Sequence, residues 1–189
     1  HDLYDRAINT GDKTERLHDF TLRYLAPFRD VLRVRARQMD LDEAWVYGLI
    51  RQESRFIVDA RSRAGASGLM QLMPATAKWV ARKMGLRNIA DVTEVDTNVS
   101  LGTYYLRHVL DNLDGEPVLA SAAYNAGPGR ARAWRPDAPM EGAIYAETIP
   151  FNETRDYVKK VMSNASYYGH NFSQQLQSLK QRLGTIGPR

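Results

Sequence analysis

Apolar residues recur at intervals of three and four along most of the chain, the spacing that gathers them on one face of an α-helix. Four stripes of this kind are long enough to predict helices. They are Leu41, Trp45, Leu49 and Ile50; Met73, Ala77, Val80 and Met84; Leu101, Tyr104, Tyr105, His108 and Val109; and Val158, Val161, Met162 and Ala165. No run alternates between apolar and polar residues as a half-buried strand does. The pattern therefore predicts an all-α, mainly helical fold.

Residues that begin or end helices bound these stripes. Asp40 and Asp42 precede the first stripe, and both are of a type that caps helix N-termini. Pro74 suits the first turn of the second helix, and Gly85 suits its C-terminal end. The third helix is expected within residues 96–115. The remaining helices are expected at 117–124, at 128–134 and after the bend at Ile149-Pro150.

The two ends of the chain differ from this central part. Before residue 40 the helical spacing is interrupted by Pro27, which should restart or kink a helix. The last residues are polar, contain Gln and Lys, and run into Gly187-Pro188. We therefore expect a helical lead-in from a preceding region over 1–40, the main domain over 41–170, and a C-terminal helical tail over 171–189.

Composition places the chain among ordinary globular proteins. It has 189 residues, of which 43% are hydrophobic and 25% are charged, a balance that suits one domain with a buried core rather than a disordered chain. The net charge is +4, a mild excess that would help to hold an acidic polymer without requiring one. Because no long basic run with interleaved aromatic residues occurs, nucleic-acid binding is disfavoured.

Residue types that build disulfides, metal sites or membrane spans are scarce. The chain has no cysteine, which excludes disulfides, thiol catalysis and cysteine-ligated metals. The four histidines lie far apart in sequence, so we expect neither a metal site nor a cofactor. The longest apolar stretch, 44–50, is too short to span a bilayer, and no signal peptide is visible. Since the first residue is His1 rather than Met, we expect any export signal to lie outside this sequence.

Four short segments carry side chains suited to chemistry. The first is 51–54, Arg-Gln-Glu-Ser, at the end of the first predicted helix, where an acidic side chain alone is usually a solvated terminus. The second is 65–74, Gly-Ala-Ser-Gly-Leu-Met-Gln-Leu-Met-Pro. Its glycines allow a tight turn and close approach by a ligand. Taken alone, it also fits a loop before a helix whose methionines pack the core.

The third and fourth segments lie nearer the C-terminus. The third is 123–129, Ala-Tyr-Asn-Ala-Gly-Pro-Gly, which turn chemistry alone would explain as the end of one helix and the start of another. Its functional interpretation places the Tyr124 hydroxyl and the Asn125 amide at the rim of a cleft. The fourth, 145–158, fits a helix N-terminus with acidic residues in its first turns. It contains Glu147, Ile149-Pro150 and Glu153-Thr154-Arg155.

Together and in this order, the four segments resemble the soluble lytic transglycosylases, relatives of goose-type lysozyme with a helical, lysozyme-like fold. The signatures that carry the resemblance are Glu-Ser, Gly-Ala-Ser-Gly-Leu-Met-Gln and Ala-Tyr-Asn-Ala-Gly. The fourth segment looks like that of the large periplasmic branch, and residues 5–9, Asp-Arg-Ala-Ile-Asn, resemble the linker of that branch. The resemblance covers roughly residues 41–168 and implies a lysozyme-like catalytic domain.

The resemblance implies that Glu53 is the only catalytic acid and base. It would protonate the leaving oxygen of a glycosidic bond, which requires a pKa raised by an apolar, partly dry cleft. The substrate's own N-acetyl group would stabilise the positive charge, and Glu53 would then take the proton of the C6 hydroxyl of N-acetylmuramic acid. The product would be a 1,6-anhydro sugar, formed without water. Candidate walls of the cleft are Leu49, Ile50, Met70 and Met73.

Further positions match residues that line the glycan groove in the family. Ser62 falls in the loop that places a serine near the N-acetyl group, and Glu147 matches a second acidic residue that faces the cleft. The remaining groove positions are Gln71, Met73 and Tyr124, with Asn125 beside them. The implied partner is the glycan strand of peptidoglycan, with no nucleic acid, cofactor or metal. The implied location is the periplasm and the implied form is a monomer.

Three alternatives stay open at this stage. The same fold could act as a muramidase, a hydrolase in which Asp59 or Glu147 activates a water. It could also be an inactive wall-binding module, although a binding groove gains little from a buried acid such as Glu53 that is costly to desolvate. Nucleic-acid binding has only the net charge of +4 in its favour.

Overall fold

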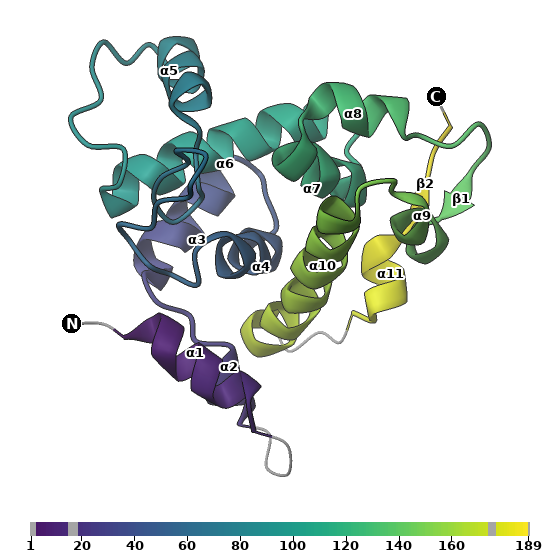
Figure 1. Cartoon of the computed structure of the whole chain (residues 1–189), viewed down its shortest axis with the longest axis horizontal. Helices are drawn as coiled ribbons and strands as arrows, with labels where there is room; N and C mark the ends of the chain where they lie inside the picture. The colour runs from purple at the N-terminus through teal and green to yellow at the C-terminus, as the bar shows by residue number, and fades with distance from the viewer. Residues whose placement is uncertain (1–2, 15–18, 174–176, 189) are drawn as a thin grey trace.

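The computed structural model describes residues 3–14, 19–173 and 177–188, and most of them are helical (Figure 1). The elements are α1 (Tyr4–Asp12), α2 (Phe20–Arg23), α3 (Arg29–Gln38), α4 (Glu43–Glu53), α5 (Pro74–Lys83), α6 (Val95–Asp111), α7 (Pro117–Ala126), α8 (Pro128–Ala133), β1 (Met140–Glu141), α9 (Gly142–Thr148), α10 (Asn152–Ser173), α11 (Leu179–Leu183) and β2 (Thr185–Ile186). The prediction of a mainly helical fold is confirmed, and each of the four stripes lies on or beside one long helix.

The helix ends agree with most of the predicted capping residues. Asp42 accepts a hydrogen bond from a backbone N–H of the first turn and so caps α4. Asp40 does not cap this helix: its backbone is left-handed, with φ of 50°, and its carboxylate pairs with Arg107 of α6. Helix α6 begins at Val95, slightly earlier than predicted, because the Glu94 side chain accepts hydrogen bonds from two N–H groups of its first turn.

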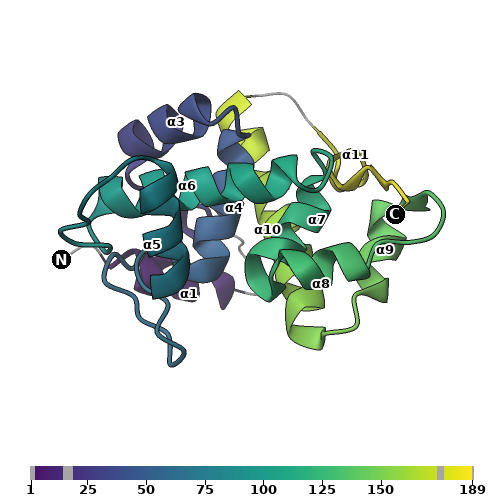
Figure 2. The same ribbon diagram turned by 90° about the horizontal axis from the view of Figure 1, so that it is seen from above.

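Helix α4 lies at the centre of the core. All residues from 44 to 51 are buried, although the sequence shows only one clear apolar stripe there. Seen from above, α4 lies between α3, α6, α7 and α10 (Figure 2). Trp45 reaches α7, where its indole N–H donates a 3.0 Å hydrogen bond to the Ser121 hydroxyl. A helix enclosed in this way must be buried on every side.

Helices α4 and α10 run antiparallel and approach each other more closely than side chains normally allow. The contact is made at Gly48, where a Cβ atom would lie 2.6 Å from the Val161 carbonyl oxygen and 2.8 Å from the Ala165 backbone nitrogen. Only glycine leaves room for this approach. The contact fixes the height and rotation of α4 against α10, and hence the position of the end of α4.

Buried apolar residues form two clusters. The larger surrounds α4, and the smaller lies between α5 and α6 and contains Leu72, Val80 and Leu101. Tyr105 of α6 and Tyr124 of α7 are partly buried and pack against both clusters. The two parts of the core therefore meet at these two tyrosines.

Two short strands were not predicted. Met140–Glu141 pairs antiparallel with Thr185–Ile186. The C-terminal segment therefore packs against the main domain. Leu183 and Ile186 of this segment are buried in the larger cluster. This pairing cannot be predicted from the sequence, because a two-residue strand is too short to show alternation.

The lead-in restarts at Pro27, as predicted. Helix α2 ends at Arg23, and α3 begins at Arg29 after Phe28, whose φ of 56° is left-handed. Two buried tyrosines tie this turn to the core helices. Tyr47 of α4 donates a 2.9 Å hydrogen bond to the carbonyl of Pro27, and Tyr168 of α10 donates a 2.8 Å bond to the carbonyl of Leu25. Among the described residues, no helix combines the length and apolar character needed to cross a bilayer.

Replacing Gly48 with alanine is expected to lower the stability of the fold. The added Cβ would meet backbone atoms of α10 at 2.6 and 2.8 Å, so the two helices would have to separate. Overpacking of this kind costs about 1–3 kcal/mol, which calorimetry would record as a lower unfolding temperature. Gly129→Ala is the matched control, because a Cβ at this position in α8 has no neighbour within 4 Å. Equal unfolding temperatures for the two variants would contradict the close contact.

Candidate active site

Glu53 is the last residue of α4, and the chain turns sharply behind it. The Ser54 hydroxyl donates to a carbonyl of the last turn at 3.3 Å and accepts from the Phe56 N–H at 3.2 Å. Arg55 and Phe56 both have left-handed φ angles, of 50° and 65°, which cost about 1–2 kcal/mol each in non-glycine residues. Burial of the Phe56 ring against Tyr47, with ring centroids 5.8 Å apart, offsets part of this strain. Because the chain turns away here, the helix does not continue past the Glu53 side chain.

The Glu53 carboxyl group is oriented by a tyrosine of the neighbouring helix. Tyr157 lies on α10 and is 5% exposed, and its hydroxyl donates a 2.6 Å hydrogen bond to Glu53 Oε1. Oε1 is occupied by this donor, whereas none of the described residues donates a hydrogen bond to Oε2. Tyr157 therefore presents one defined oxygen of the acid to the site.

The environment of Glu53 changes its protonation. Burial raises the pKa of Glu53 from 4.5 to about 7, because a buried carboxylate loses the solvation that stabilises its charge. The hydrogen bond from Tyr157 acts against this rise, and the negative charge of Glu153, in the first turn of α10, adds to it. An acid with a pKa near neutrality is present in both protonation states at pH 7. That is the requirement for a group that acts as acid and then as base.

A second tyrosine faces the same acid from α7. Burial raises the pKa of both Tyr124 and Tyr157 well above the ordinary value, and the charge of Glu53 raises both further. Both hydroxyls therefore stay protonated at neutral pH. Tyr124 donates its proton to the Met70 carbonyl at 2.8 Å, and its ring packs 5.4 Å from that of Tyr105. Its proton is thus committed to the backbone, while the lone pairs of its oxygen remain to accept a bond from a ligand.

Three hydrogen bonds donated by hydroxyl groups connect the elements around Glu53, and we call them the hydroxyl frame. The Tyr157–Glu53 bond joins α10 to α4, and the Tyr124–Met70 bond joins α7 to the loop before α5. The third is donated by the buried Thr154 of α10 to Asn125 Oδ1 at 2.7 Å. The Asn125 amide nitrogen is left free to face a ligand. The frame gathers three of the predicted site residues, which are Glu53, Tyr124 and Asn125.

Ser62 and Gln71 lie in the glycine loop, residues 60–72, where their polar groups hold the backbone. Ser62 is exposed, and its Oγ accepts a 3.0 Å hydrogen bond from the Ala66 N–H. The Gln71 amide nitrogen donates to the carbonyls of Ala60 and Gly68, at 3.0 and 2.8 Å. Both side chains therefore shape the loop, and Gln71 has only its carbonyl oxygen left for a ligand.

The glycine loop is anchored by Asn98, a fully buried residue of α6. Asn98 accepts a 2.7 Å hydrogen bond from the Met70 N–H and donates to the carbonyls of Ser67 and Val92. Gly68 lies directly against it, with φ of 80° and no room for a Cβ atom. Asn98 thus holds the segment whose Met70 carbonyl receives the hydroxyl of Tyr124.

The remaining predicted residues lie at the margins of this arrangement. Met73 precedes α5 and is 42% exposed, so its thioether is available for contact. Of the other candidate walls, Leu49, Ile50 and Met70 are fully buried. Glu147 on α9 is exposed and forms a 3.0 Å ion pair with Lys159. Asp59 is also exposed. Neither of these two carboxylates takes part in the hydroxyl frame.

Sequence reasoning missed the roles of Tyr157, Thr154 and Asn98. Tyr157 and Thr154 belong to the fourth segment, three residues apart, so helical spacing alone puts them on the same side of α10. That signal was present in the sequence, but nothing in it linked this side to Glu53. Asn98 gave no signal, because an asparagine among polar residues at a helix start is typical of a cap.

A separate hollow of about 610 Å³ lies next to the glycine loop, between α5 and residues 86–92. Its wall includes Ser67 and Leu72 of that loop, but not Glu53 or the tyrosines of the frame. Within the part of the chain that the structure describes, no group of three or more acidic or histidine side chains is arranged to hold a metal ion.

Comparison with known proteins places this arrangement in a family. The model of the Transglycosylase SLT domain matches residues 30–144, which include Glu53, the glycine loop and both frame residues of α7. The chain belongs to the soluble lytic transglycosylase family. The model of the Soluble lytic transglycosylase helical domain matches residues 148–176, the region of α10.

Members of this family with curated names are similar over most of the chain. The soluble lytic murein transglycosylase of Salmonella typhimurium is 35% identical over 92% of this chain, and that of Escherichia coli K12 is 33% identical over 88%. The chain spans only 27% and 26% of the length of these two relatives.

Solved structures confirm the fold. An inactive Glu-to-Gln mutant of the lytic transglycosylase Slt from Pseudomonas aeruginosa matches with a TM-score of 0.86 and 41% identity, over 93% of this chain and 29% of that one. The 70 kDa soluble lytic transglycosylase of Escherichia coli matches with a TM-score of 0.83 and 27% identity, over 95% and 29%. The expected fold class, the mainly helical fold of the lytic transglycosylases, is therefore correct.

Replacing Glu53 with glutamine is expected to stabilise the fold at alkaline pH. Folding raises the pKa of Glu53 from 4.5 to about 7, so the stability that its protonated form contributes is complete below about pH 4.5 and is lost as pH rises through about 7. Glutamine carries no charge and avoids this loss. The difference in the free energy of unfolding between Glu53→Gln and the parent should therefore grow in favour of the variant by about 1–3 kcal/mol from roughly pH 4 to pH 8.

Urea unfolding at both pH values measures this gain. Glu147→Gln is the control, because it makes the same chemical change at an exposed carboxylate, and it should show no comparable dependence on pH. If Glu53→Gln and the control showed the same change in unfolding free energy with pH, Glu53 would not be buried enough for its pKa to rise.

Proposed function

We propose that this protein cleaves the glycan strands of peptidoglycan as a lytic transglycosylase, with Glu53 as its acid and base. The supporting observation is an acid with its pKa raised to about 7, at an open helix end, with one carboxyl oxygen held by Tyr157. Family membership agrees with this role, and a similar protein is described as inactive after a Glu-to-Gln change.

The first step needs an acid. Protonated Oε2 of Glu53 gives its proton to the oxygen of the bond between N-acetylmuramic acid and N-acetylglucosamine, and the bond from C1 to that oxygen breaks. Positive charge develops at C1 of the muramic acid, where the N-acetyl group of the same sugar stabilises it. The N-acetylglucosamine part leaves with the proton, and Glu53 is left as a carboxylate.

The second step needs a base close to the same sugar. The Glu53 carboxylate takes the proton of the C6 hydroxyl, and the bond between O6 and C1 closes the 1,6-anhydro ring. Glu53 is protonated again and ready for another cycle. No water enters, because the internal hydroxyl reaches effective concentrations on the order of 10⁵ M or more in a well-oriented sugar.

The residues around Glu53 fit the binding of a sugar strand. The Asn125 amide nitrogen and the Tyr124 oxygen present a donor and an acceptor beside the acid, since the other atoms of these groups are occupied by the frame. Met73 offers an exposed thioether that can pack against an N-acetyl methyl or a sugar face. Gln71 and Ser62 serve mainly by shaping the glycine loop, with the Gln71 carbonyl oxygen as a further acceptor.

A muramidase on the same fold is the second candidate, and the position of the carboxylates argues against it. A hydrolase needs a base for water or a nucleophile. Glu147 is exposed and paired with Lys159, and Asp59 is exposed on a surface turn. Glu153 acts on the pKa of Glu53, but it too lies exposed at the start of α10.

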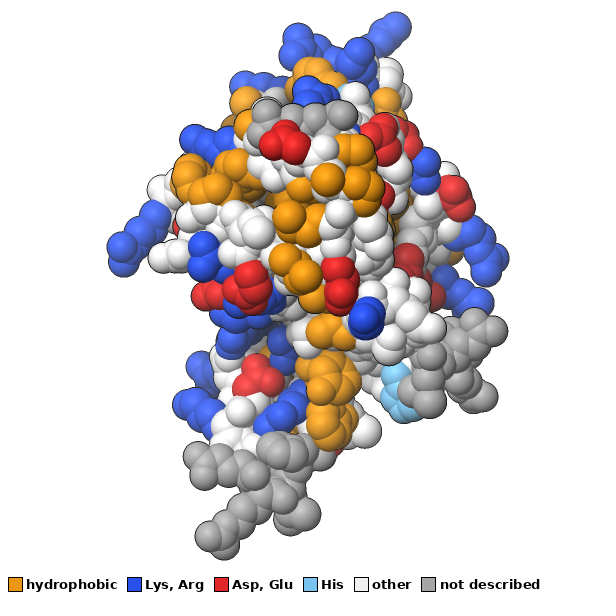
Figure 3. Space-filling model, turned by 90° about the vertical axis from the view of Figure 1, so that its right-hand side faces the viewer, with side chains coloured by type: hydrophobic (Ala, Val, Ile, Leu, Met, Phe, Trp, Pro, Cys, Tyr) orange, Lys and Arg blue, Asp and Glu red, His pale blue; other side chains and the backbone are white. Residues whose placement is uncertain are grey.

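The remaining alternatives have less support. A wall-binding module without activity would gain nothing from a carboxyl group whose burial opposes its charge. For nucleic-acid binding, a continuous basic surface would be needed. On the face that carries α9 and α11, Lys and Arg side chains lie mainly toward the edges, and acidic side chains lie among them (Figure 3). We further propose that the protein acts on this substrate in the periplasm and as a monomer.

The test of the catalytic acid is Glu53→Gln in a turbidity assay on purified cell walls. The variant keeps the shape of the side chain but has no proton to give, so cleavage should fall by at least about 10²–10⁴-fold. Glu147→Gln is the matched control and should slow the enzyme without silencing it. Cleavage by Glu53→Gln within a few-fold of the parent would place the acid elsewhere.

The products distinguish the lyase from the hydrolase. Mass spectrometry of the soluble fragments should show 1,6-anhydro-N-acetylmuramic ends, lighter by one water than muramidase products. Digestion in ¹⁸O-water should leave these ends unlabelled. Labelled reducing ends as the main product would support the hydrolase, and Glu153→Gln and Glu147→Gln would then identify its second carboxylate.

A further inference from the structure

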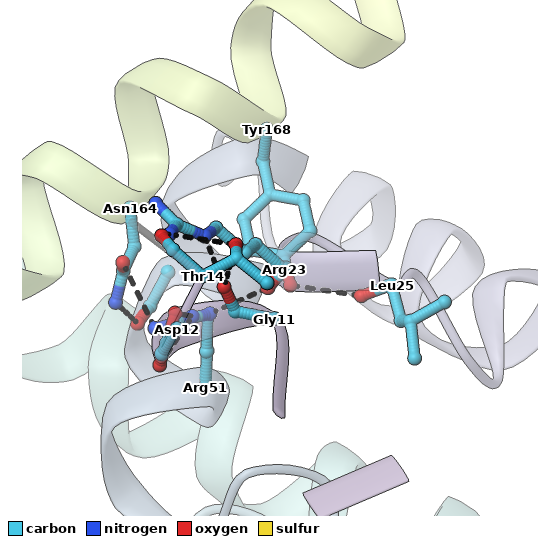
Figure 4. A network of polar contacts seen from close by, with 9 residues as sticks. Gly11, Asp12, Thr14, Arg23, Leu25, Arg51, Asn164 and Tyr168 are labelled. Carbon is cyan, nitrogen blue, oxygen red and sulfur yellow. Dashed lines mark hydrogen bonds and ion pairs between the residues drawn. The ribbon is translucent and has the colours of Figure 1, made fainter. Parts of the chain in front are cut away.

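Arg51 lies two residues before Glu53 and is buried, with only 9% of its surface exposed. Successive residues of an α-helix are 100° apart, so side chains two positions apart point to nearly opposite sides. Glu53 bonds Tyr157 at the site, whereas Arg51 faces Asp12 and Arg23 of the lead-in (Figure 4). Burying a guanidinium costs free energy unless its N–H donors are paired. The partners of Arg51 must therefore offset the loss of its hydration.

Four groups surround the Arg51 guanidinium. Both Asp12 carboxylate oxygens accept from its Nη2, at 3.0 and 3.2 Å, and the Arg23 carbonyl accepts from its Nε at 3.0 Å. Asn164 of α10 accepts at 3.4 Å, and the guanidinium lies 4.9 Å from the centre of the Tyr24 ring. We call the set of Asp12, Arg23, Arg51 and Asn164 the Arg51 latch.

The latch ties the lead-in to the helix that ends in Glu53. Asp12 is the last residue of α1, and Arg23 is the last of α2. The Arg23 side chain in turn donates to the carbonyls of Gly11 and Thr14, at 2.6 and 2.7 Å, so α1 and α2 hold each other in place (Figure 4). The Asp12 carboxylate therefore has a fixed position from which to bind Arg51.

The last turn of α4 needs such support from outside. The final carbonyls of a helix lack N–H partners within the helix, and helix ends fray for this reason. Here the turn is held on one side by the Tyr157–Glu53 bond and on the other by the latch. Losing either would allow the turn to move and water to reach the acid.

We propose that the Asp12–Arg51 ion pair positions Glu53, by fixing the last turn of α4 from the side opposite the substrate. The inference rests on the role proposed for Glu53. It makes Asp12 a positioning residue, which acts through Arg51 and the shared helical turn and does not touch the sugar. Helices α1 and α2 then support the site without contacting the substrate.

The titratable and charged groups on the two sides of the last turn of α4 determine how movement of this turn would change the pKa of Glu53. Tyr157 and Glu153 of α10 and Tyr124 of α7 face Glu53. Asp12, Arg23, Tyr24 and Tyr168 surround the back of the turn. If the turn moves and water enters, burial raises the pKa of Glu53 less than it does in the intact protein. Glu53 then titrates at lower pH, and the protonated acid becomes scarcer at neutral pH.

The test is Asp12→Asn, which keeps the shape of the side chain and removes its charge. Titration of the Glu53 carboxyl carbon by ¹³C NMR should move down by about one pH unit. The alkaline fall of kcat/KM should move with it, for a loss of up to about tenfold at neutral pH. Asp12→Glu, which restores the charge, should recover most of both shifts.

Asp96→Asn is the matched control. It breaks the two-pronged pair between Asp96 of α6 and Arg35 of α3, whose Nε–Oδ1 distance is 2.9 Å and which includes no group of the Arg51 latch. A role in stability alone would affect both variants without moving the Glu53 titration. An Asp12→Asn titration that coincides with those of Asp96→Asn and the parent therefore overturns the proposal.

Two further measurements keep the outcome decisive. If Asp12→Asn does not fold, amide hydrogen exchange in Arg51→Lys, which keeps the charge but replaces the forked guanidinium with a single ammonium group, reports on the same turn. Faster exchange at residues 52–55 supports the proposal, and unchanged exchange overturns it. Activity retained in Glu53→Gln would refute the proposed function, whereas the NMR titration would still decide whether Asp12 positions Glu53.

Discussion

The site depends on the direct backbone contact between α4 and α10 at Gly48. Because the two helices touch there and run antiparallel, the end of α4 meets the start of α10, where Tyr157 and Thr154 project. The same register brings Tyr47 against Tyr168, with ring centroids 5.0 Å apart, and these two tyrosines bind the turn between α2 and α3. A missing side chain in the core thus sets distances at a site more than one helical turn away.

Burial of Glu53 raises the pKa of its carboxyl group and weakens the fold at the same time. The free energy that raises the pKa to about 7 is also free energy lost from stability whenever the carboxylate is charged. The hydroxyl frame limits this loss, since Tyr157 compensates part of the charge and still leaves one oxygen free. The left-handed turn at Arg55 and Phe56 adds strain in the same place. The end of α4 is therefore kept in place by contacts with neighbouring elements, because its own conformation is strained.

The sequence predicted the features that depend on local chemistry and missed those that depend on distant contacts. The helices, the cap at Asp42 and the restart after Pro27 follow from spacing and turn residues, and all are present. Glu53 was identified by the resemblance, since its segment alone is ordinary. Asp40 is not a cap because α4 begins at Glu43, so that Asp42 occupies the capping position, and Asp40 instead pairs with the distant Arg107. The partners Tyr157 and Asn98 could not be assigned, because only the packing of α10 and α6 brings them to the acid and to the glycine loop.

Similarity to the family's catalytic domain begins at residue 30, but the Arg51 latch reaches back to Asp12. A fragment cut at residue 30 would keep Arg51 but discard its counter-ion, the Arg23 carbonyl and the Tyr24 ring. The hydroxyls of Tyr47 and Tyr168 would lose the Pro27 and Leu25 carbonyls as well. Each hydrogen bond lost in this way costs about 0.5–1.5 kcal/mol, a noticeable share of the stability of a domain of this size. We therefore expect chimaeras or minimal enzymes built from this chain to be more stable when they are joined ahead of α1.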